Sequence, residues 1–119
     1  MTRPDAPAGT HVIAFTTAPT AEAARALVTA LVERRLVACG TVVPGATSVY
    51  WWHGAVERQE EALVVLKTTT QRWEELAAAV SGLHPYDVPE LVALPVVSGL
   101  PAYLRWVSEE TAEPGTGKE

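Results

Sequence analysis

The run EALVVLKT, residues 61–68, restricts the fold of this chain more than any other segment. It is short and rich in β-branched residues, so it predicts a strand. Successive side chains of a strand point to opposite faces of the sheet. Alternate residues from Ala62 to Leu66 therefore face one way, while Leu63 and Val65 face the other, and both sets are apolar. A strand with this pattern belongs in a sheet that is buried on both faces.

The segment before this run predicts a strand followed by a helix. Residues 11–18 are apolar and β-branched and stop at Pro19, which is typical of a buried strand. Thr20 is a favourable helix cap, and an apolar stripe at helical spacing follows it. We expect this helix to end near Arg34 and Arg35, because positive charge suits a helix C-terminus.

A long hairpin is the next predicted feature. Residues 37–52 are strand-like but contain Pro44 and Gly45, where we expect a bend or bulge. His53-Gly54 suits a two-residue turn, and the return strand covers residues 56–68. Two arms of about 11 residues, at about 3.4 Å each, extend about 35 to 40 Å. The tip of the hairpin should therefore project beyond its own core.

The C-terminal third predicts a helix, a strand and a short final helix. The first of these begins near the threonines at 68–70, and Gly82 is a natural stop for it. Residues 91–97 predict the last strand, and Pro101 suits the start of a terminal helix. The resulting β-α-β-β-α-β order is that of the ferredoxin-like α+β fold, with two helices on one face of an antiparallel sheet.

Two helices cover only one face of such a sheet, although the strands are apolar on both. We therefore expect a second copy of the chain to cover the other face. The folded domain should span residues 11–110. The ends, residues 1–10 and 111–119, are rich in Pro, Gly, Thr and charge, and we expect them to be disordered tails.

Composition excludes several classes of protein. The net charge is −5 and the nine Lys and Arg residues are scattered, so we expect no nucleic-acid partner. The most apolar helical segment contains Arg25 and Glu33, which rules out a membrane span there. Cys39 is the only cysteine, so the chain has no internal disulfide, and a cytoplasmic location is expected.

The hairpin gathers aromatic and acidic residues. Tyr50, Trp51 and Trp52 stand in a row, and we interpret them as rings that pack at an interface, because interfaces favour Tyr and Trp. A nucleic-acid stacking platform would also need a basic groove. The acidic run of Glu57, Glu60 and Glu61 is interpreted as a solvated strand edge.

Four polar residues interrupt the apolar C-terminal half: Lys67, His84, Tyr86 and Glu90. Lys67 either extends to solvent or forms a fixed cation in a cleft with Glu90. His84 precedes Pro85 and is either a hydrogen-bonded structural residue or a ligand. No four-ligand zinc pattern and no nucleotide-binding or hydrolase motif occurs in the sequence.

Several motifs together resemble the CutA1 family of divalent-ion tolerance proteins. They are RLVAC, PG-x-x-S-x-YWW-x-G, LKT, HPY-x-VPE and YL-x-W, in this order, and the similarity runs from about residue 12 to 108. The resemblance implies a ferredoxin-like protomer in a tight homotrimer similar to the PII signalling proteins. It also implies a cytosolic protein, linked to tolerance of copper and other divalent ions, that is not an enzyme.

The resemblance also implies site residues. Where family members have a proposed copper-binding cysteine and a histidine pair, this chain has Thr16 and Leu83-His84, which leaves His84 as the one candidate metal ligand. Residues at family-typical positions imply a cleft between subunits lined by Cys39, Trp52, Lys67, Tyr86 and Glu90. Tyr50, Trp51 and Trp52 would lie at the trimer interface.

Three hypotheses of function follow. The first is a non-catalytic homotrimer of metal-ion tolerance, without a tightly bound cofactor, that binds divalent cations such as copper weakly at most. The second is a PII-like regulatory or scaffold trimer that binds a small anionic metabolite near Lys67 in the cleft between subunits. The third, a small hydrolase or transferase using His84 and Glu90, has no accompanying nucleophile or oxyanion site.

Overall fold

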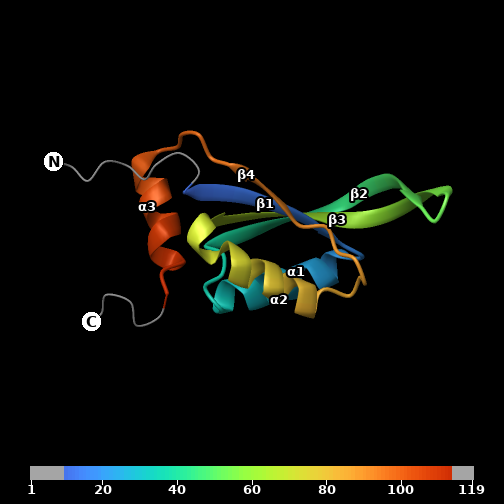
Figure 1. The fold of residues 1–119 in the computed structure, drawn as a ribbon, viewed down its shortest axis with the longest axis horizontal. Helices are drawn as coiled ribbons and strands as arrows, with labels where there is room; N and C mark the ends of the chain where they lie inside the picture. Colours follow the sequence, from blue (N-terminus) through green and yellow to red (C-terminus); the bar gives the residue numbers. More distant parts are fainter. Residues whose placement is uncertain (1–9, 114–119) are drawn as a thin grey trace.

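The computed structural model describes residues 10–113, which form an elongated body of 56 × 27 × 22 Å (Figure 1). The four strands and three helices are β1 (His11–Ala18), α1 (Ala21–Glu33), β2 (Cys39–Trp52), β3 (Ala55–Thr69), α2 (Trp73–Leu83), β4 (Val92–Pro95) and α3 (Pro101–Glu110). A single 3₁₀ turn, Thr70–Arg72, leads into α2. Every predicted element is present.

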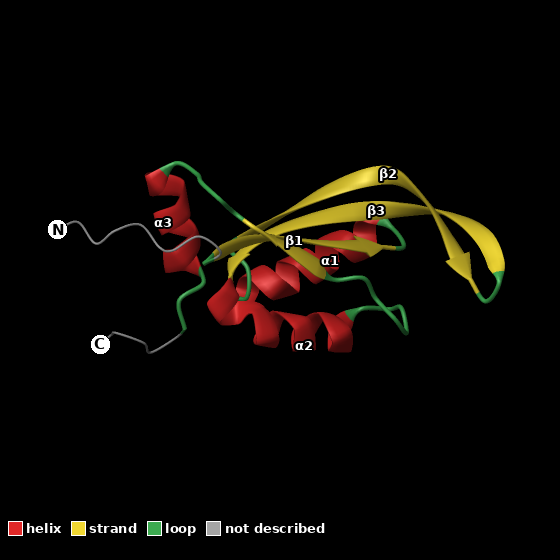
Figure 2. Ribbon diagram, turned by 45° about the horizontal axis from the view of Figure 1, so that its top comes forward, coloured by secondary structure: helices red, strands yellow, loops and turns green. Residues whose placement is uncertain are grey.

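The strands form one antiparallel sheet in the order β2-β3-β1-β4. Helices α1 and α2 lie side by side on one face of this sheet, and the β2–β3 hairpin extends past them (Figure 2). The predicted ferredoxin-like arrangement with two helices on one face is confirmed.

The core lies between the sheet and these two helices. Val64 and Leu66 from β3 are completely buried, and so are Leu31 of α1 and Leu76 of α2. Gly40 of β2 belongs to this layer because it leaves room for its neighbours. A Cβ placed on Gly40 would lie 2.7 Å from Val28 Cγ1 and 2.9 Å from Leu66 Cδ2, closer than van der Waals contact permits.

The opposite face of the sheet is mostly apolar and only partly covered. Directly paired residues of antiparallel strands share a face, so the strand register shows which side chains of the four strands lie on this face. The residues on this face are Ile13, Phe15 and Thr17 of β1, Leu63, Val65 and Lys67 of β3, Cys39, Thr41 and Val43 of β2, and Val92 and Leu94 of β4. We call this surface the open face. Leu94 is 58% exposed and Val92 is 53% exposed, so this part of the open face is an exposed apolar surface in one chain.

The hairpin bends and turns where the sequence predicts. The register of β2 against β3 shifts between Val43 and Ala46, and Gly45 within this bulge has a φ of 76°. The turn residues His53 and Gly54 have φ values of 50° and 82°, as a two-residue hairpin turn of this kind requires. The hairpin continues past the last β1 pair, Ala18 with Ala62, and projects from the body (Figure 1).

The helix ends differ in detail from the prediction. Helix α1 closes with Arg35 in the left-handed region, at a φ of 59°, and Leu36 N–H donates to the carbonyl of Leu31. The predicted stop of α2 at Gly82 is wrong, because the helix runs to Leu83. It ends at His84, whose extended backbone is the conformation that a following proline imposes.

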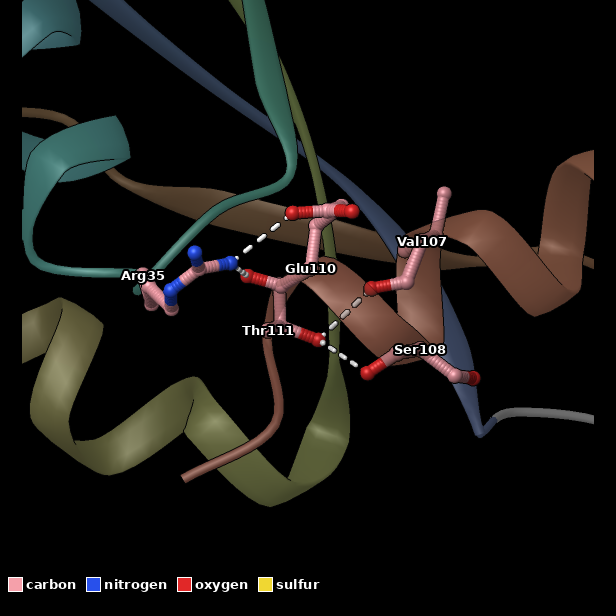
Figure 3. Close-up of polar contacts among 5 residues, drawn as sticks. All are labelled: Arg35, Val107, Ser108, Glu110 and Thr111. Atoms are coloured by element: carbon pink, nitrogen blue, oxygen red, sulfur yellow. Dashed lines mark hydrogen bonds and ion pairs between the residues drawn. The ribbon is translucent and has the colours of Figure 1, made fainter. Parts of the chain in front are cut away.

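Helix α3 covers one end of the open face. The ring of His11 lies 2.8 Å from Ser108 Oγ, and Tyr103 OH lies 3.7 Å from Cys39 Sγ. Figure 3 shows how the end of α3 is held: Arg35 donates to both the carbonyl and the carboxylate of Glu110.

Most of both predicted tails lies outside the described residues. Within the described part, Thr111 is only 2% exposed and its hydroxyl donates to the carbonyl of Val107, just beyond the expected domain end at residue 110 (Figure 3). Across residues 10–113, none of the helices has both the length and the apolar character needed to cross a membrane.

Two glycine substitutions should have opposite effects on stability. Gly40→Ala places a methyl group against Val28 and Leu66, and overpacking of this kind costs about 1 to 3 kcal/mol. Gly82→Ala adds a methyl group to α2 where no atom lies within 4 Å, and it should gain about 0.5 to 1 kcal/mol. Urea unfolding of both variants at one protein concentration measures the difference. A Gly40→Ala protein as stable as Gly82→Ala would contradict this packing.

Candidate functional site

A cavity of about 510 Å³ lies where β1 ends and the hairpin continues without it. The loop of residues 84–91, between α2 and β4, forms its other wall. The lining residues are Thr17 of β1, Ser48, Val49, Tyr50 and Trp52 of β2, Gln59 and Glu61 of β3, and Tyr86, Asp87, Val88 and Glu90 of the loop. Strand β1, the two strands of the hairpin and the loop thus meet at one site.

A chain of hydrogen bonds crosses the cavity wall. Tyr50 OH donates to Gln59 Oε1 over 2.8 Å, and Gln59 Nε2 donates to Tyr86 OH over 3.3 Å. Tyr86 OH in turn donates to Glu61 Oε2 over 2.6 Å. Each group donates a hydrogen bond to the next, and the chain ends on a carboxylate, which accepts such bonds most strongly when ionised.

The charged lining of the cavity is entirely acidic. Glu61, Asp87 and Glu90 contribute carboxylates, and no lysine, arginine or histidine is among the lining residues. Glu61 is only 7% exposed, and within residues 10–113 it has no ion-pair partner. The cavity therefore attracts positive charge.

The position of Tyr86 changes its acidity. Its partial burial, followed by its hydrogen bond to Glu61 and the negative charge of that carboxylate, raises the pKa of the Tyr86 phenol well above its usual value. Loss of the phenolic proton would place a second negative charge against Glu61. The proton between the two oxygens is thus firmly held.

His84 holds the loop against β1. Its Nδ1 accepts from the backbone N–H of Tyr86 over 3.1 Å, so the proton is on Nε2, which donates to the carbonyl of Thr17. The ring is 7% exposed and both nitrogens are engaged. A metal ion bound to His84 would have to break one of these bonds, so the geometry corresponds to the structural alternative for this residue.

The predicted cleft residues separate into two groups within one protomer. Trp52, Tyr86 and Glu90 meet in the cavity. Cys39 and Lys67 pair with one another across β2 and β3 near α3, and Lys67 Nζ donates to Thr41 Oγ1. Lys67 is six residues along β3 from Glu61, which is about 20 Å in a strand.

The three aromatic residues of the hairpin point to both of its faces. Tyr50 and Trp52 line the cavity, whereas Trp51 between them lies on the opposite side and is 73% exposed. Their predicted place at a trimer interface is outside what a single protomer tests.

Sequence reasoning missed Glu61, Gln59 and Asp87. The interpretation of the acidic run as a solvated edge is correct for Glu57 and Glu60, which are exposed, and wrong for Glu61. The sequence does contain one signal for Glu61. This residue lies two and four residues before Leu63 and Val65 on the same strand, so its side chain shares the face of these apolar residues.

The sequence is similar to known proteins over almost the entire described region. Residues 12–110 match the family described as CutA1 divalent ion tolerance protein. A divalent-cation tolerance protein CutA from Thermus thermophilus is 48% identical over 99 residues, which are 83% of this chain and 96% of that protein. A mouse protein CutA is 41% identical over 103 residues, which are 87% of this chain and 58% of the mouse protein.

Solved structures agree with the sequence comparison. The Cut A1 divalent cation tolerance protein from Thermus thermophilus superimposes with a TM-score of 0.84 at 46% identity, over 86% of this chain and 99% of that one. CutA1 from Oryza sativa gives a TM-score of 0.85 at 37% identity, over 89% of this chain and 97% of that one. A structure from Archaeoglobus fulgidus is described as a periplasmic divalent cation tolerance protein CutA. It is 31% identical and gives a TM-score of 0.83, over 86% of this chain and 99% of that one.

The acidity of Tyr86 gives a testable pH dependence. Because its folded-state pKa is raised, the neutral phenol favours folding below the ordinary tyrosine pKa of about 10, and this contribution is lost as the pH rises further. Ultraviolet titration of the folded protein should show a late tyrosinate component that Tyr86→Phe removes. Ionisation of that component near pH 10, the ordinary value, would contradict the hydrogen bond to Glu61.

Proposed function

The chain belongs to the CutA1 family of divalent ion tolerance proteins, and on that basis we propose that it acts in tolerance of divalent cations, copper among them. In this proposal it is a non-catalytic homotrimer that binds such cations weakly at most, in the cytoplasm. The observation that carries the binding role is the acidic cavity, in which Glu61, Asp87 and Glu90 face the same space.

The open face supports assembly. Phe15, Leu63 and Val65 lie at its centre and remain partly accessible in one chain, while the flanking β4 residues are more than half exposed. Burying this surface against other copies would remove apolar area from water at about 25 cal/mol per Å². The projecting hairpin gives each subunit an arm that can reach its neighbours (Figure 2).

Weak rather than tight metal binding fits the available ligands. Within the described part of the chain, no three His, Cys, Asp or Glu side chains are placed to hold one ion. Thr16 is completely buried, and Cys39 lies at the α3 end of the sheet. The cavity itself offers carboxylate and phenol oxygens, which are poor ligands for soft metals such as Cu(I). These residues do not fit a high-affinity copper site in a single protomer.

A non-catalytic role is consistent with the polar groups of the cavity. Ser48 and Thr17 supply hydroxyls, but no histidine lines the cavity to activate them as nucleophiles. His84 is engaged on both nitrogens. The pair of His84 and Glu90 considered from the sequence therefore lacks a free imidazole, since both ring nitrogens of His84 are hydrogen-bonded.

The alternative role, binding of an anionic metabolite near Lys67, is less well supported. The cavity repels anions because its ionisable lining is acidic. Lys67 lies near the other end of the sheet, beside Cys39 and Thr41.

Copper titration of matched variants tests the proposal. Calorimetry with Cu²⁺ should give weak binding to the wild type and about tenfold or more weaker binding to the double variant Glu61→Gln, Glu90→Gln, because both changes remove negative charge. His84→Gln keeps a donor and an acceptor for the loop, and its isotherm should match the wild type.

Glu33→Gln is the control, since Glu33 is an exposed carboxylate at the end of α1 and does not line the cavity. Unchanged binding in the double variant would remove the cavity from the proposal. Loss of binding in His84→Gln alone would identify His84 as a ligand.

A further inference from the structure

The cavity is larger than one metal ion needs, and its carboxylates are not arranged to hold such an ion tightly. A volume of about 510 Å³ is within the range of sites for small organic molecules, about 300 to 1,000 Å³. The three carboxylates lie around this space without converging, since no metal-binding cluster occurs among the described residues. An organic cation is large enough to fill this space, and one with charge at two separate points can pair with more than one of the carboxylates.

Glu61 is the strongest indication of a positively charged ligand. A buried carboxylate is costly unless it is paired with positive charge and hydrogen-bonded. The structure provides the hydrogen bond from Tyr86 to Oε2, but within residues 10–113 it provides no ion-pair partner for this carboxylate. Glu61 lines the cavity, so a cation there would supply a counter-ion.

The aromatic lining suits an organic cation in particular. Tyr50, Trp52 and Tyr86 contribute three rings to the same cavity. The face of an aromatic ring carries partial negative charge and therefore attracts an ammonium group placed over it. Val49 and Val88 add apolar surface that an aliphatic chain can contact.

The positions of the carboxylates suggest how charge is spaced on the ligand. Glu61 is buried on the β3 side, whereas Asp87 and Glu90 lie on the loop side, where both are exposed. A molecule with two ammonium groups can pair with both sides at once, with its aliphatic chain passing the rings.

We propose that this cavity is a binding site for small aliphatic amines with two ammonium groups, with Glu61 as the inner counter-ion and Asp87 or Glu90 as the outer one. The proposal rests on the cation-binding role given to the same cavity above, and it adds the chemical class of the ligand.

Three probes of equal chain length test the charge requirement on the full-length protein. They are 1,4-diaminobutane, which is a dication, 1,4-butanediol, which is neutral, and succinate, which is a dianion. Calorimetry in the presence of a metal chelator should show saturable binding of the diamine alone. Added salt should weaken this binding, because the outer carboxylates are accessible to solvent and screened.

Two variants locate the binding. Glu61→Gln should weaken diamine binding at least tenfold, and Asp87→Asn, at an exposed position that the fold should tolerate, should weaken it several-fold. Glu33→Gln should bind as the wild type does.

Three results would overturn the proposal: no diamine binding, equal binding of the diol, or binding unchanged in both cavity variants. If diamine binding is absent while copper binding still depends on Glu61, this inference fails and the proposed function stands. If copper binding is also independent of the cavity, both fail.

Discussion

The open face of the sheet is the constraint on which the other features depend. Residues of β3 alternate between two apolar sets, and the helices cover only the set that contains Val64 and Leu66. The second set, which includes Leu63 and Val65, joins Phe15 and Val92 in a continuous apolar surface across the strands. An isolated chain would leave this surface in water, which favours its burial against other copies of the chain.

The same geometry produces the cavity. Strand β1 stops at Ala18 while the hairpin continues, and the loop from α2 to β4 must cross the space that β1 leaves. His84 fixes the start of this loop on the carbonyl of Thr17, and Tyr86 then reaches Glu61. A polar, acidic site thus lies at the border of an apolar surface. Association of chains there would exclude water from the site, and its carboxylates would then attract a cation more strongly.

Much of this fold could be predicted from the sequence, because it depends on local patterns. Alternation identified the two-faced strand, Pro44-Gly45 identified the bulge, and His53-Gly54 identified the turn. The site could not be predicted to the same extent. Whether Glu61 is exposed or buried depends on the path of a distant loop, and whether His84 has a free nitrogen depends on its contact with β1. The spacing of Glu61 from Leu63 and Val65 indicates which face of the sheet it shares, but it does not show which distant loop covers it.

Sedimentation equilibrium of the wild-type protein measures whether chains associate through the open face. A species of three times the 12.7 kDa chain mass should persist throughout the micromolar range. A folded species with the mass of a single chain at these concentrations would contradict it, because the open face would then be stable in water without a partner.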